Sequence, residues 1–347
     1  MKINKRPTIK QVAKAAGVST QTVSRVINNR PDVSPETRQR IQQVIENLGY
    51  QPSELARSLI QQRSFTLGVV IAGLKYIGPS RTLNGITQRA EELGYSLLLK
   101  ELPSFTTGEI QPLFQSLIAR HVDGIIWATS EVGENQSWVS ESLRDFTVPI
   151  VFITAHPREG VFSIAYDNRY GGQMATRHLL HQGYQHIGHI TGPLDWWEAR
   201  ERKLGWEQAL REAGKEPSDN HWQEGNWSSA SGESAFLKLL ETYPGMDAVF
   251  VGNDQMALGL LQAARRKGLQ VPHELGLIGF DGIPESRYYW PPLSTIMQDQ
   301  NLLGCLAVEK VVAIIECLRL EEAPPEPAAE VLLPELIIRE SSGEKVV

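Results

Sequence analysis

The hydrophobic pattern of the chain changes near residue 65. Before that point, apolar residues recur every three or four positions in short segments, which is typical of amphipathic helices. Beyond it, apolar runs alternate with amphipathic stretches, and the runs predict buried strands at 65–72, 95–100, 122–127 and 149–154, then at 186–191, 246–252 and 275–280. Strands separated by helices are typical of parallel sheets. The pattern therefore predicts a small all-α head followed by an α/β body with two doubly wound parallel lobes.

The first segment has the signals of a helix that ends in a tight turn. Thr8 and Gln11 have the spacing of a capping box, in which the side chains satisfy free backbone N–H groups of the first turn. Gly17 is expected to end the helix in the left-handed conformation, and Ser19 to cap the next helix. The buried stripe of this helix consists of Ile9, Val12, Ala13 and Ala16.

The second helix, expected at 20–28, carries residue types that can read DNA. Val23, Val26 and Ile27 form its apolar face, and the opposite face consists of Thr20, Gln21, Thr22, Ser24, Arg25 and Asn28. Short polar side chains and a planar guanidinium suit base edges and phosphates in a groove. A third helix begins at the cap Ser34, and its apolar residues are expected to close the core of the three helices: Ile41, Val44, Ile45 and Leu48. Amphipathic helices are common and few bind DNA, so a plain helical bundle is the alternative.

The charge distribution favours DNA binding by the head. Residues 1–63 contain 11 Lys and Arg against 4 Asp and Glu, whereas the rest of the chain contains 23 against 36. A basic module attracts phosphates and an acidic body repels them, so only the head is expected to approach nucleic acid. The formal net charge of −6 for the whole chain conceals this division.

Composition disfavours several other classes of protein. No apolar run approaches the roughly 18 residues of a membrane span and no signal peptide is recognisable, so a cytoplasmic protein is expected. Cys305 and Cys317 lie twelve residues apart in one expected helix and are interpreted as buried thiols, without the spacing of a disulfide or a metal site. No metal, cofactor or catalytic residue is expected.

Polar residues gather after the apolar runs of the second half of the chain. Ligands bind beyond the carboxyl ends of parallel strands, which brings together segments 191–202, 252–254 and 279–282, with the loop 226–229. They supply Arg, Asn, Asp and Trp, which suit the hydroxyls and the apolar face of a sugar. Each residue alone has a structural alternative, since Trp is usually core and Asp often caps a helix. The pair Trp196 and Trp197 is compatible with stacking on a disaccharide or with simple packing of the two rings.

The segment 8–28 and the hinge Pro52…Ala56-Arg57-Ser58-Leu59 resemble the lactose/galactose repressor (LacI/GalR) family. The resemblance implies base contacts in the major groove by Thr20, Gln21 and Arg25, and phosphate contacts by Thr8, Ser19, Thr22, Ser24, Asn28 and Ser34. It also implies that Ala56 and Leu59 enter the minor groove, Leu59 as a wedge, although the hinge alone could be a plain linker. Thr20 stands where the lactose repressor has a tyrosine, so the operator sequence stays open.

The body resembles the same family, whose fold is that of type I periplasmic sugar-binding proteins. The matching motifs are Gly192-Pro-Leu, Arg202-Lys-Leu-Gly-Trp, Trp227-Ser-Ser-Ala-Ser-Gly, Asn253-Asp-Gln-Met-Ala-Leu-Gly, Gly279-Phe-Asp and Thr295-Ile-Met-Gln-Asp. The resemblance implies an effector pocket lined by Arg202, Trp227, Asn253, Asp281 and Gln298, with Tyr76, Pro79 and Glu198 beside them. Trp196, from the extra pair Trp196-Trp197, is expected to add stacking surface to this pocket. Thr154 replaces an aspartate of the lactose repressor and Gln300 a phenylalanine, so the effector stays open.

The expected organisation is a helix-turn-helix head at 1–50, a hinge helix and linker at 51–64, a first lobe at 65–166 with 298–326, a second lobe at 167–297 with 327–341, and a tail at 342–347. The chain would cross between the lobes three times, which makes lobe closure a hinge motion. No leucine heptads follow the second lobe, so a homodimer is expected.

These features predict a DNA-binding transcription regulator, a repressor that a mono- or disaccharide releases from a palindromic operator. The runner-up is corepression, in which a purine-type ligand strengthens DNA binding. A nucleotide-binding α/β enzyme is disfavoured because Val69-Val-Ile-Ala-Gly-Leu has neither a G-x-G-x-x-G turn nor a Gly-Lys-Ser/Thr. A glycosidase could pair Glu198 with Asp281 but would leave the head unexplained. A secreted binding protein is also disfavoured, because it would need a signal peptide and none is recognisable.

Overall fold

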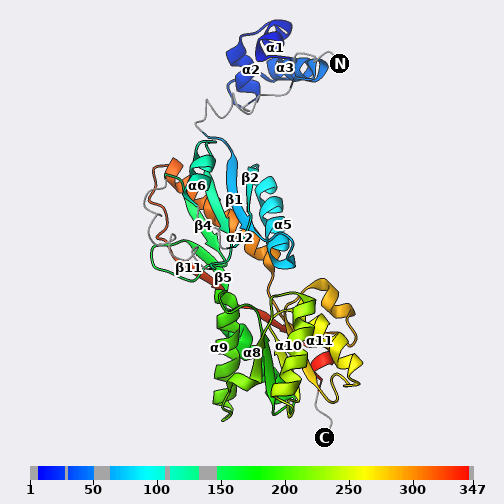
Figure 1. Cartoon of the computed structure of the whole chain (residues 1–347). Coiled ribbons are helices and arrows are strands. Elements are labelled where there is room, and N and C mark those ends of the chain that lie inside the picture. The colour runs from blue at the N-terminus through cyan, green and yellow to red at the C-terminus, as the bar shows by residue number, and fades with distance from the viewer. Residues whose placement is uncertain (1–6, 28–29, 51–62, 106–109, 133–146, 344–347) are drawn as a thin grey trace. The chain divides into compact units, whose positions relative to one another are not determined.

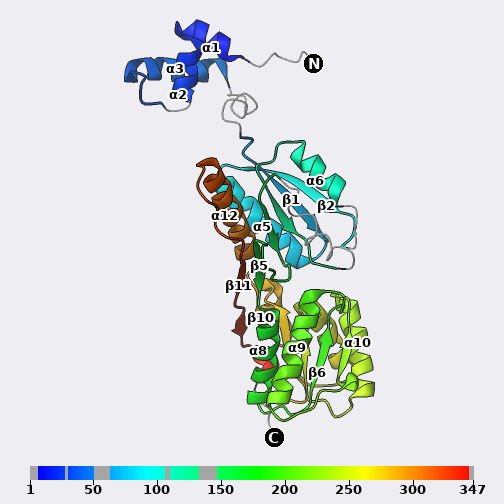
Figure 2. The same cartoon turned by 90° about the vertical axis from the view of Figure 1, so that its left-hand side faces the viewer.

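The computed structural model describes residues 7–27, 30–50, 63–105, 110–132 and 147–343. They form two compact units, one up to Phe65 and one from Thr66 onward. Figures 1 and 2 show the elements of both units from two sides. None of the helices in these ranges combines the length and the apolar character that a membrane span needs.

The first unit is a bundle of α1 (Ile9–Ala16), α2 (Thr20–Ile27) and α3 (Pro35–Leu48). The Thr8 backbone N–H donates to Gln11 Oε1 at 2.8 Å, and Gly17 is left-handed with φ 66°, so α1 begins and ends as predicted. The prediction that Leu48 belongs to the core is wrong. It is the last residue of α3 and 39% exposed, and Tyr50 packs against the core beyond it. The buried core consists of Val12, Ala13, Ala16, Val23, Val26 and Ile41.

The first lobe of the second unit is a parallel sheet in the order β11-β5-β4-β3-β1-β2. Helices α5 (Ile77–Glu92) and α12 (Gln300–Arg319) cover one face, side by side in Figure 2, and α6 (Gln111–Ile118) covers the other. The strands are β1 (Thr66–Ala72), β2 (Ser96–Leu102), β3 (Gly124–Ala128), β4 (Ile150–Ile153), β5 (Ser163–Tyr166) and β11 (Ala329–Leu332).

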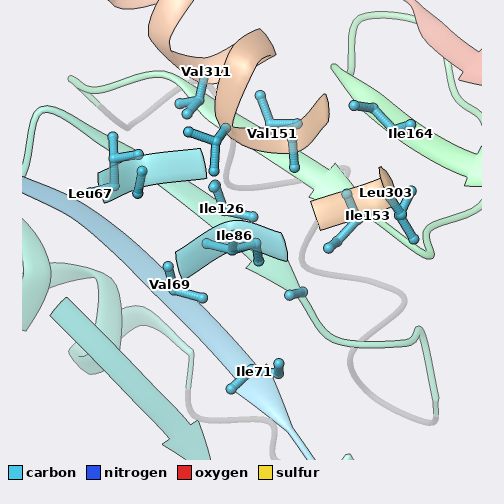
Figure 3. Close-up of a cluster of buried hydrophobic side chains, with 14 of the residues drawn as sticks. Leu67, Val69, Ile71, Ile86, Ile126, Val151, Ile153, Ile164, Leu303 and Val311 are labelled. Atoms are coloured by element: carbon cyan, nitrogen blue, oxygen red, sulfur yellow. The ribbon is translucent and has the colours of Figure 1, made fainter. Parts of the chain in front are cut away.

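Both faces of this sheet are buried, which explains the continuous apolar runs in the sequence. Leu67, Val69 and Ile71 of β1 pack with Ile86 of α5 and Val311 of α12, as Figure 3 shows. The residues between them on β1 pack against α6 on the opposite face. A strand covered on both sides has no polar face, so its sequence shows no alternation.

The second lobe has a sheet in the order β12-β10-β9-β8-β6-β7, in which only the β12–β10 pair is antiparallel. Helices α8 (Asn168–His181) and α9 (Trp197–Glu212) cover one face, and α10 (Ser229–Thr242) and α11 (Asp254–Arg266) the other. The predicted doubly wound α/β fold is confirmed. The strands are β6 (Ile187–Thr191), β7 (Trp222–Glu224), β8 (Ala248–Val251), β9 (Gly276–Asp281), β10 (Ser294–Met297) and β12 (Glu335–Ile337).

The seven predicted strands correspond to β1, β2, β3, β4, β6, β8 and β9, each within two residues of its expected bounds. The strands β5, β7, β10, β11 and β12 were not predicted. They contain three or four residues each and every one includes a polar residue, so no continuous apolar run marks them, unlike the equally short β4 and β8.

The chain passes between the lobes after β5, after β10 and between β11 and β12. Two predicted boundaries are wrong. Residues 327–332 are expected in the second lobe, but β11 pairs with β5 of the first sheet, so the third crossing comes at Leu333 and Pro334. Residue 342 is expected to begin a tail, but Ser342 is buried in the second lobe, where its hydroxyl donates to Ser294 Oγ at 2.6 Å.

Cys305 and Cys317 are both free and lie on α12. The interpretation as buried thiols is wrong, because both are only half-buried. They flank the stripe of α12 that faces the sheet, and this stripe includes Leu303, Ala307 and Val311.

Candidate functional site

Three of the predicted phosphate contacts lie at helix N-termini of the head. Ser19 Oγ accepts from the Thr22 backbone N–H at 3.1 Å, Ser34 Oγ accepts from the Thr37 backbone N–H at 3.4 Å, and Thr8 precedes α1. All three caps are exposed. A helix N-terminus presents free N–H groups and partial positive charge, so these positions suit a phosphate backbone.

The predicted base-reading residues Thr20, Gln21 and Arg25 are exposed on α2, and Thr22 and Ser24 are half-buried beside them. Arg25 Nη1 lies 3.2 Å from Asp32 Oδ2, and about half of each side chain is exposed. A solvated pair of this kind contributes about 0–1 kcal/mol, so the guanidinium can exchange Asp32 for a base edge at little cost. Asn28, Ala56, Leu59 and most of the predicted hinge lie outside the described residues.

A cavity lies between the two lobes of the second unit. Counted with its open mouth it has about 910 Å³ of space, near the upper end of the range of ~300–1,000 Å³ that is usual for small-ligand sites. Tyr76 and Pro79 reach it from the first lobe, and Gln298 from the second crossing. All nine predicted effector residues line it: Tyr76, Pro79, Trp196, Glu198, Arg202, Trp227, Asn253, Asp281 and Gln298.

Arg202 of α9 is the centre of the polar network in this cavity. Its Nε donates to Asn168 Oδ1 at 2.8 Å, its Nη1 to the Gly252 carbonyl at 2.5 Å and its Nη2 to Gln298 Oε1 at 3.4 Å. Nη1 also lies 3.4 Å from Asp281 Oδ1. Asn168 follows the first crossing and Gln298 the second, so one side chain ties together two connections between the lobes. Of the five guanidinium donors, one N–H on Nη2 has no partner among the described residues.

Burial controls the charges around this network. It lowers the pKa of Arg202, which Asp281 opposes, and it raises the pKa of Asp281, which Arg202 opposes. Asp254 lies nearby and is fully buried; burial and then the charge of Asp281 raise its pKa to about 8. Asp254 accepts from Thr295 Oγ1 at 2.7 Å and from the Ile283 backbone N–H at 2.9 Å. Asp254 therefore anchors the segment that directly follows Asp281, the last residue of β9.

Asn253 caps α11 and positions Trp227. Its Oδ1 accepts a backbone N–H of the first turn of α11 at 2.8 Å, and its Nδ2 donates to the Trp227 carbonyl at 3.1 Å. Trp227 has φ 70°, and its ring lies against Gly192, where a Cβ would be 2.1 Å away. The cavity residues Asp281 and Thr154 also have positive φ, 97° and 59°. Side chains rarely adopt this backbone conformation, and such strain concentrates at functional sites.

Four aromatic rings form a row along the cavity. Their centroids are 6.1 Å apart for Tyr76 and Phe105, 4.5 Å for Phe105 and Trp196, and 5.7 Å for Trp196 and Trp227. The first two rings come from the first lobe and the last two from the second. Trp197 is not in this row, since its ring meets the edge of His156 at 5.7 Å. The two tryptophans therefore have different surroundings.

Two buried polar atoms of the cavity, Glu198 Oε2 and Trp227 Nε1, have no hydrogen-bond partner within the described ranges. The other carboxylate oxygen of Glu198 accepts from Ser130 Oγ at 2.9 Å. Burial raises the pKa of Glu198, and its own backbone N–H, the Ser130 hydrogen bond and the charge of Arg202 oppose this increase. An unpaired buried polar atom costs free energy, and a ligand that supplies its partner recovers it.

Three cavity residues that make these contacts, Phe105, Ser130 and Asn168, were not predicted. Asn168 lies two residues after β5, which was itself missed because its Ser-Ile-Ala-Tyr sequence is not a continuous apolar run. Ser130 lies at the carboxyl end of β3, so the strand-end rule applied to the first lobe would have found it. Phe105 follows β2 without any polar signal.

Comparison with known proteins finds relatives of the whole chain. Residues 8–53 match the bacterial regulatory proteins of the lacI family, and residues 176–342 match a periplasmic binding protein-like domain. The chain is 35% identical over 338 residues to the HTH-type transcriptional repressor PurR of Pasteurella multocida, which covers 96% of this chain and 98% of that protein. It is 36% identical over 309 residues to the ribose operon repressor of Escherichia coli, which covers 88% and 92%.

A solved structure of the lac repressor dimer bound to operator and the anti-inducer ONPF also matches. The TM-score is 0.85 at 30% identity, over 98% of this chain and 100% of that chain. These relatives are repressors and not enzymes, and the matches include the helix-turn-helix head as well as the two-lobed body. The chain therefore belongs to the lacI family of bacterial regulatory proteins and is a DNA-binding transcriptional repressor.

Proposed function

We propose that this repressor binds a sugar in the cavity between its lobes and that the sugar releases it from a palindromic operator. The observation that carries the proposal is the combination of Arg202, Asp281 and amide side chains with a row of aromatic rings in one cavity. Vicinal hydroxyls need donors and acceptors placed together, and the apolar face of a sugar ring packs on an aromatic ring.

The position of Arg202 allows ligand binding to change the arrangement of the two lobes. Its hydrogen bonds to Asn168 and Gln298 hold two of the three crossings, and its remaining N–H faces no described partner. A ligand that binds Arg202 and Asp281 more tightly in one arrangement of the lobes shifts the protein toward it. A coupling of ~1–3 kcal/mol suffices for a 5–150-fold change in operator affinity.

We also propose that the repressor is a cytoplasmic homodimer and that it binds a two-fold symmetric operator. Tyr288 and Trp290 of the second lobe are 79% and 85% exposed, and large exposed apolar side chains mark association surfaces. The related lac repressor structure is a dimer on its operator, and a palindrome needs two heads. Sedimentation of Trp290→Asp should show a monomer where the wild type is a dimer. An unchanged dimer would place this residue outside the interface.

The second candidate function is corepression by a purine-type ligand. The similarity to PurR, with 35% identity over 96% of the chain, favours it. The rings of Phe105 and Trp196 could also hold a flat base. In that case the ligand would tighten the operator complex.

Operator release tests both candidates. Duplexes that bind the full chain are selected from a random pool, and the complex is titrated with sugars and with purine bases while fluorescence anisotropy is followed. We expect a sugar to weaken operator binding at least fivefold, in the range of a typical coupling. A purine that strengthens binding would replace the proposal by corepression, and a panel without effect would contradict both.

Adjacent residues of α9 provide a matched pair of variants. Arg202→Lys loses the planar fork and should abolish the response to sugar. Lys203→Arg should keep the response, because Lys203 lies over the Trp222 ring at 4.7 Å and pairs with Glu207, away from the network of Arg202. Loss of the response in both variants would indicate a general defect of α9.

A further inference from the structure

The start of α9 connects the two lobes beside the cavity. Three consecutive residues of the second lobe each contact a different loop of the first lobe, after β2, β4 and β3. The contacts are Trp196 with Phe105 at 4.5 Å, Trp197 with His156 at 5.7 Å and Glu198 with Ser130 at 2.9 Å. This segment therefore belongs to both the lobe interface and the ligand cavity.

Glu198 has a distinct role within this segment because its two oxygens are in different situations. Oε1 accepts the hydrogen bond from Ser130, whereas Oε2 is buried and has no partner among the described residues. The side chain is only 8% exposed and lines the cavity. An oxygen of an ionised carboxylate is an acceptor only, so the group that completes it must be a hydrogen-bond donor.

The charges around the cavity also favour a neutral or cationic ligand group at Glu198. The charged side chains that line it are Glu198, Asp281 and Arg202, two acids and one base. Arg202 is already held by Asp281 at 3.4 Å. Glu131, next to Ser130, forms a bidentate pair with Arg158, so that guanidinium is also engaged. An anionic ligand group at Glu198 would meet a like charge, and within the described residues the guanidinium groups of Arg202 and Arg158 are already paired with carboxylates.

Building on the proposed sugar site, we propose that Glu198 determines the class of effector. It accepts a hydrogen bond from a hydroxyl or amino group of a neutral or cationic sugar, and it excludes sugar phosphates. The hydrogen bond from Ser130 orients the carboxylate, so Glu198 contacts both the ligand and the first lobe. Glu198 is thus a specificity residue for the effector.

Matched ligand sets test this assignment by calorimetry on the full chain. Each set contains a neutral sugar, its amino derivative and its phosphate, such as glucose, glucosamine and glucose 6-phosphate, with cellobiose and lactose as two-ring members. We expect the best neutral or amino member to bind at least tenfold more tightly than its phosphate, since a like-charge contact opposes the phosphate. A phosphate that binds best would overturn the inference and leave the sugar site standing. Absence of binding by every member would overturn the sugar site and this inference with it.

Three variants separate specificity from structure. Glu198→Gln can keep the acceptor for Ser130 while placing an NH₂ donor at the site of Oε2, so the preference for the neutral sugar should fall at least tenfold. Glu198→Ala removes the charge without adding a donor and should also lower the preference. If one of the two variants fails to fold, the other still tests the role of the carboxylate. Ser130→Ala keeps the carboxylate but removes the hydrogen bond that orients it, so the preference should fall by less than in the Glu198 variants. An unchanged preference in both Glu198 variants, or an equal fall in Ser130→Ala, would refute the role of the carboxylate.

Discussion

Acidification should destabilise the second lobe through His189, a fully buried residue of β6. Its ring stacks on Phe250 and Trp206, with centroids 4.5 and 5.5 Å away. Its Nδ1 lies 2.8 Å from the Phe250 carbonyl, which accepts, so Nδ1 carries the proton of the neutral ring. Nε2 has no partner in the described part of the chain. A second proton would create a buried cation, and burial lowers the pKa of His189 from 6.5 to about 3.

The direction and size of the effect follow from this pKa. Between pH 6.5 and about 3 only the unfolded chain takes up a proton at His189, because the folded pKa is depressed. The free energy of unfolding therefore falls by up to about 1.4 kcal/mol per pH unit as the pH decreases through this window. The resulting decrease in the free energy of unfolding is negligible at pH 8 and reaches about 2 kcal/mol at pH 5.

Urea titrations of the wild type and His189→Asn at pH 8 and pH 5 test this reasoning. Asparagine can still donate to the Phe250 carbonyl but does not titrate. Other groups, such as His178, whose pKa burial also lowers, are common to both proteins and cancel in the comparison. The wild type should lose about 2 kcal/mol more than the variant on going to pH 5. Equal losses would show that His189 is not kept neutral in the folded protein.

Three further variants probe packing, the polar network and DNA reading. Gly85→Ala would place a Cβ 2.0 Å from a backbone oxygen of α12 and should cost ~1–3 kcal/mol in urea titrations, whereas Gly78→Ala on the same helix has open space and should cost nothing. Arg202→Ala should cost ~3–5 kcal/mol because Asp281 loses its cation, and Asp281→Asn in that background should restore part of it; purely additive losses would contradict the pair. Arg25→Ala should weaken operator binding by ~1–3 kcal/mol but leave a scrambled duplex nearly unaffected in anisotropy titrations, and equal losses would exclude a base contact.

Local signals were sufficient for the head and for most of the strands. The Gln11 contact to Thr8, the left-handed Gly17 and the caps Ser19 and Ser34 depend on residues within a few positions of each other. Strands such as β1 and β8 are buried on both faces, so their apolar runs stand out in the sequence. The edge strand β11 has exposed and half-buried residues in alternation, which is why its lobe was misassigned.

The sequence by itself determined the family, the fold class and the residue types around the cavity, because periodicity, capping and motif spacing are local properties of the chain. Tertiary structure decided which polar atoms of the cavity have hydrogen-bond partners and which do not. Arg202 and Asn168 are 34 residues apart and meet because α9 packs against α8. Ser130 and Glu198 are 68 residues apart and meet only where the two lobes are in contact. Within the described residues, one oxygen of Glu198 is buried without a partner while the other accepts from Ser130, so the specificity that we propose for the cavity depends on the packing of the two lobes.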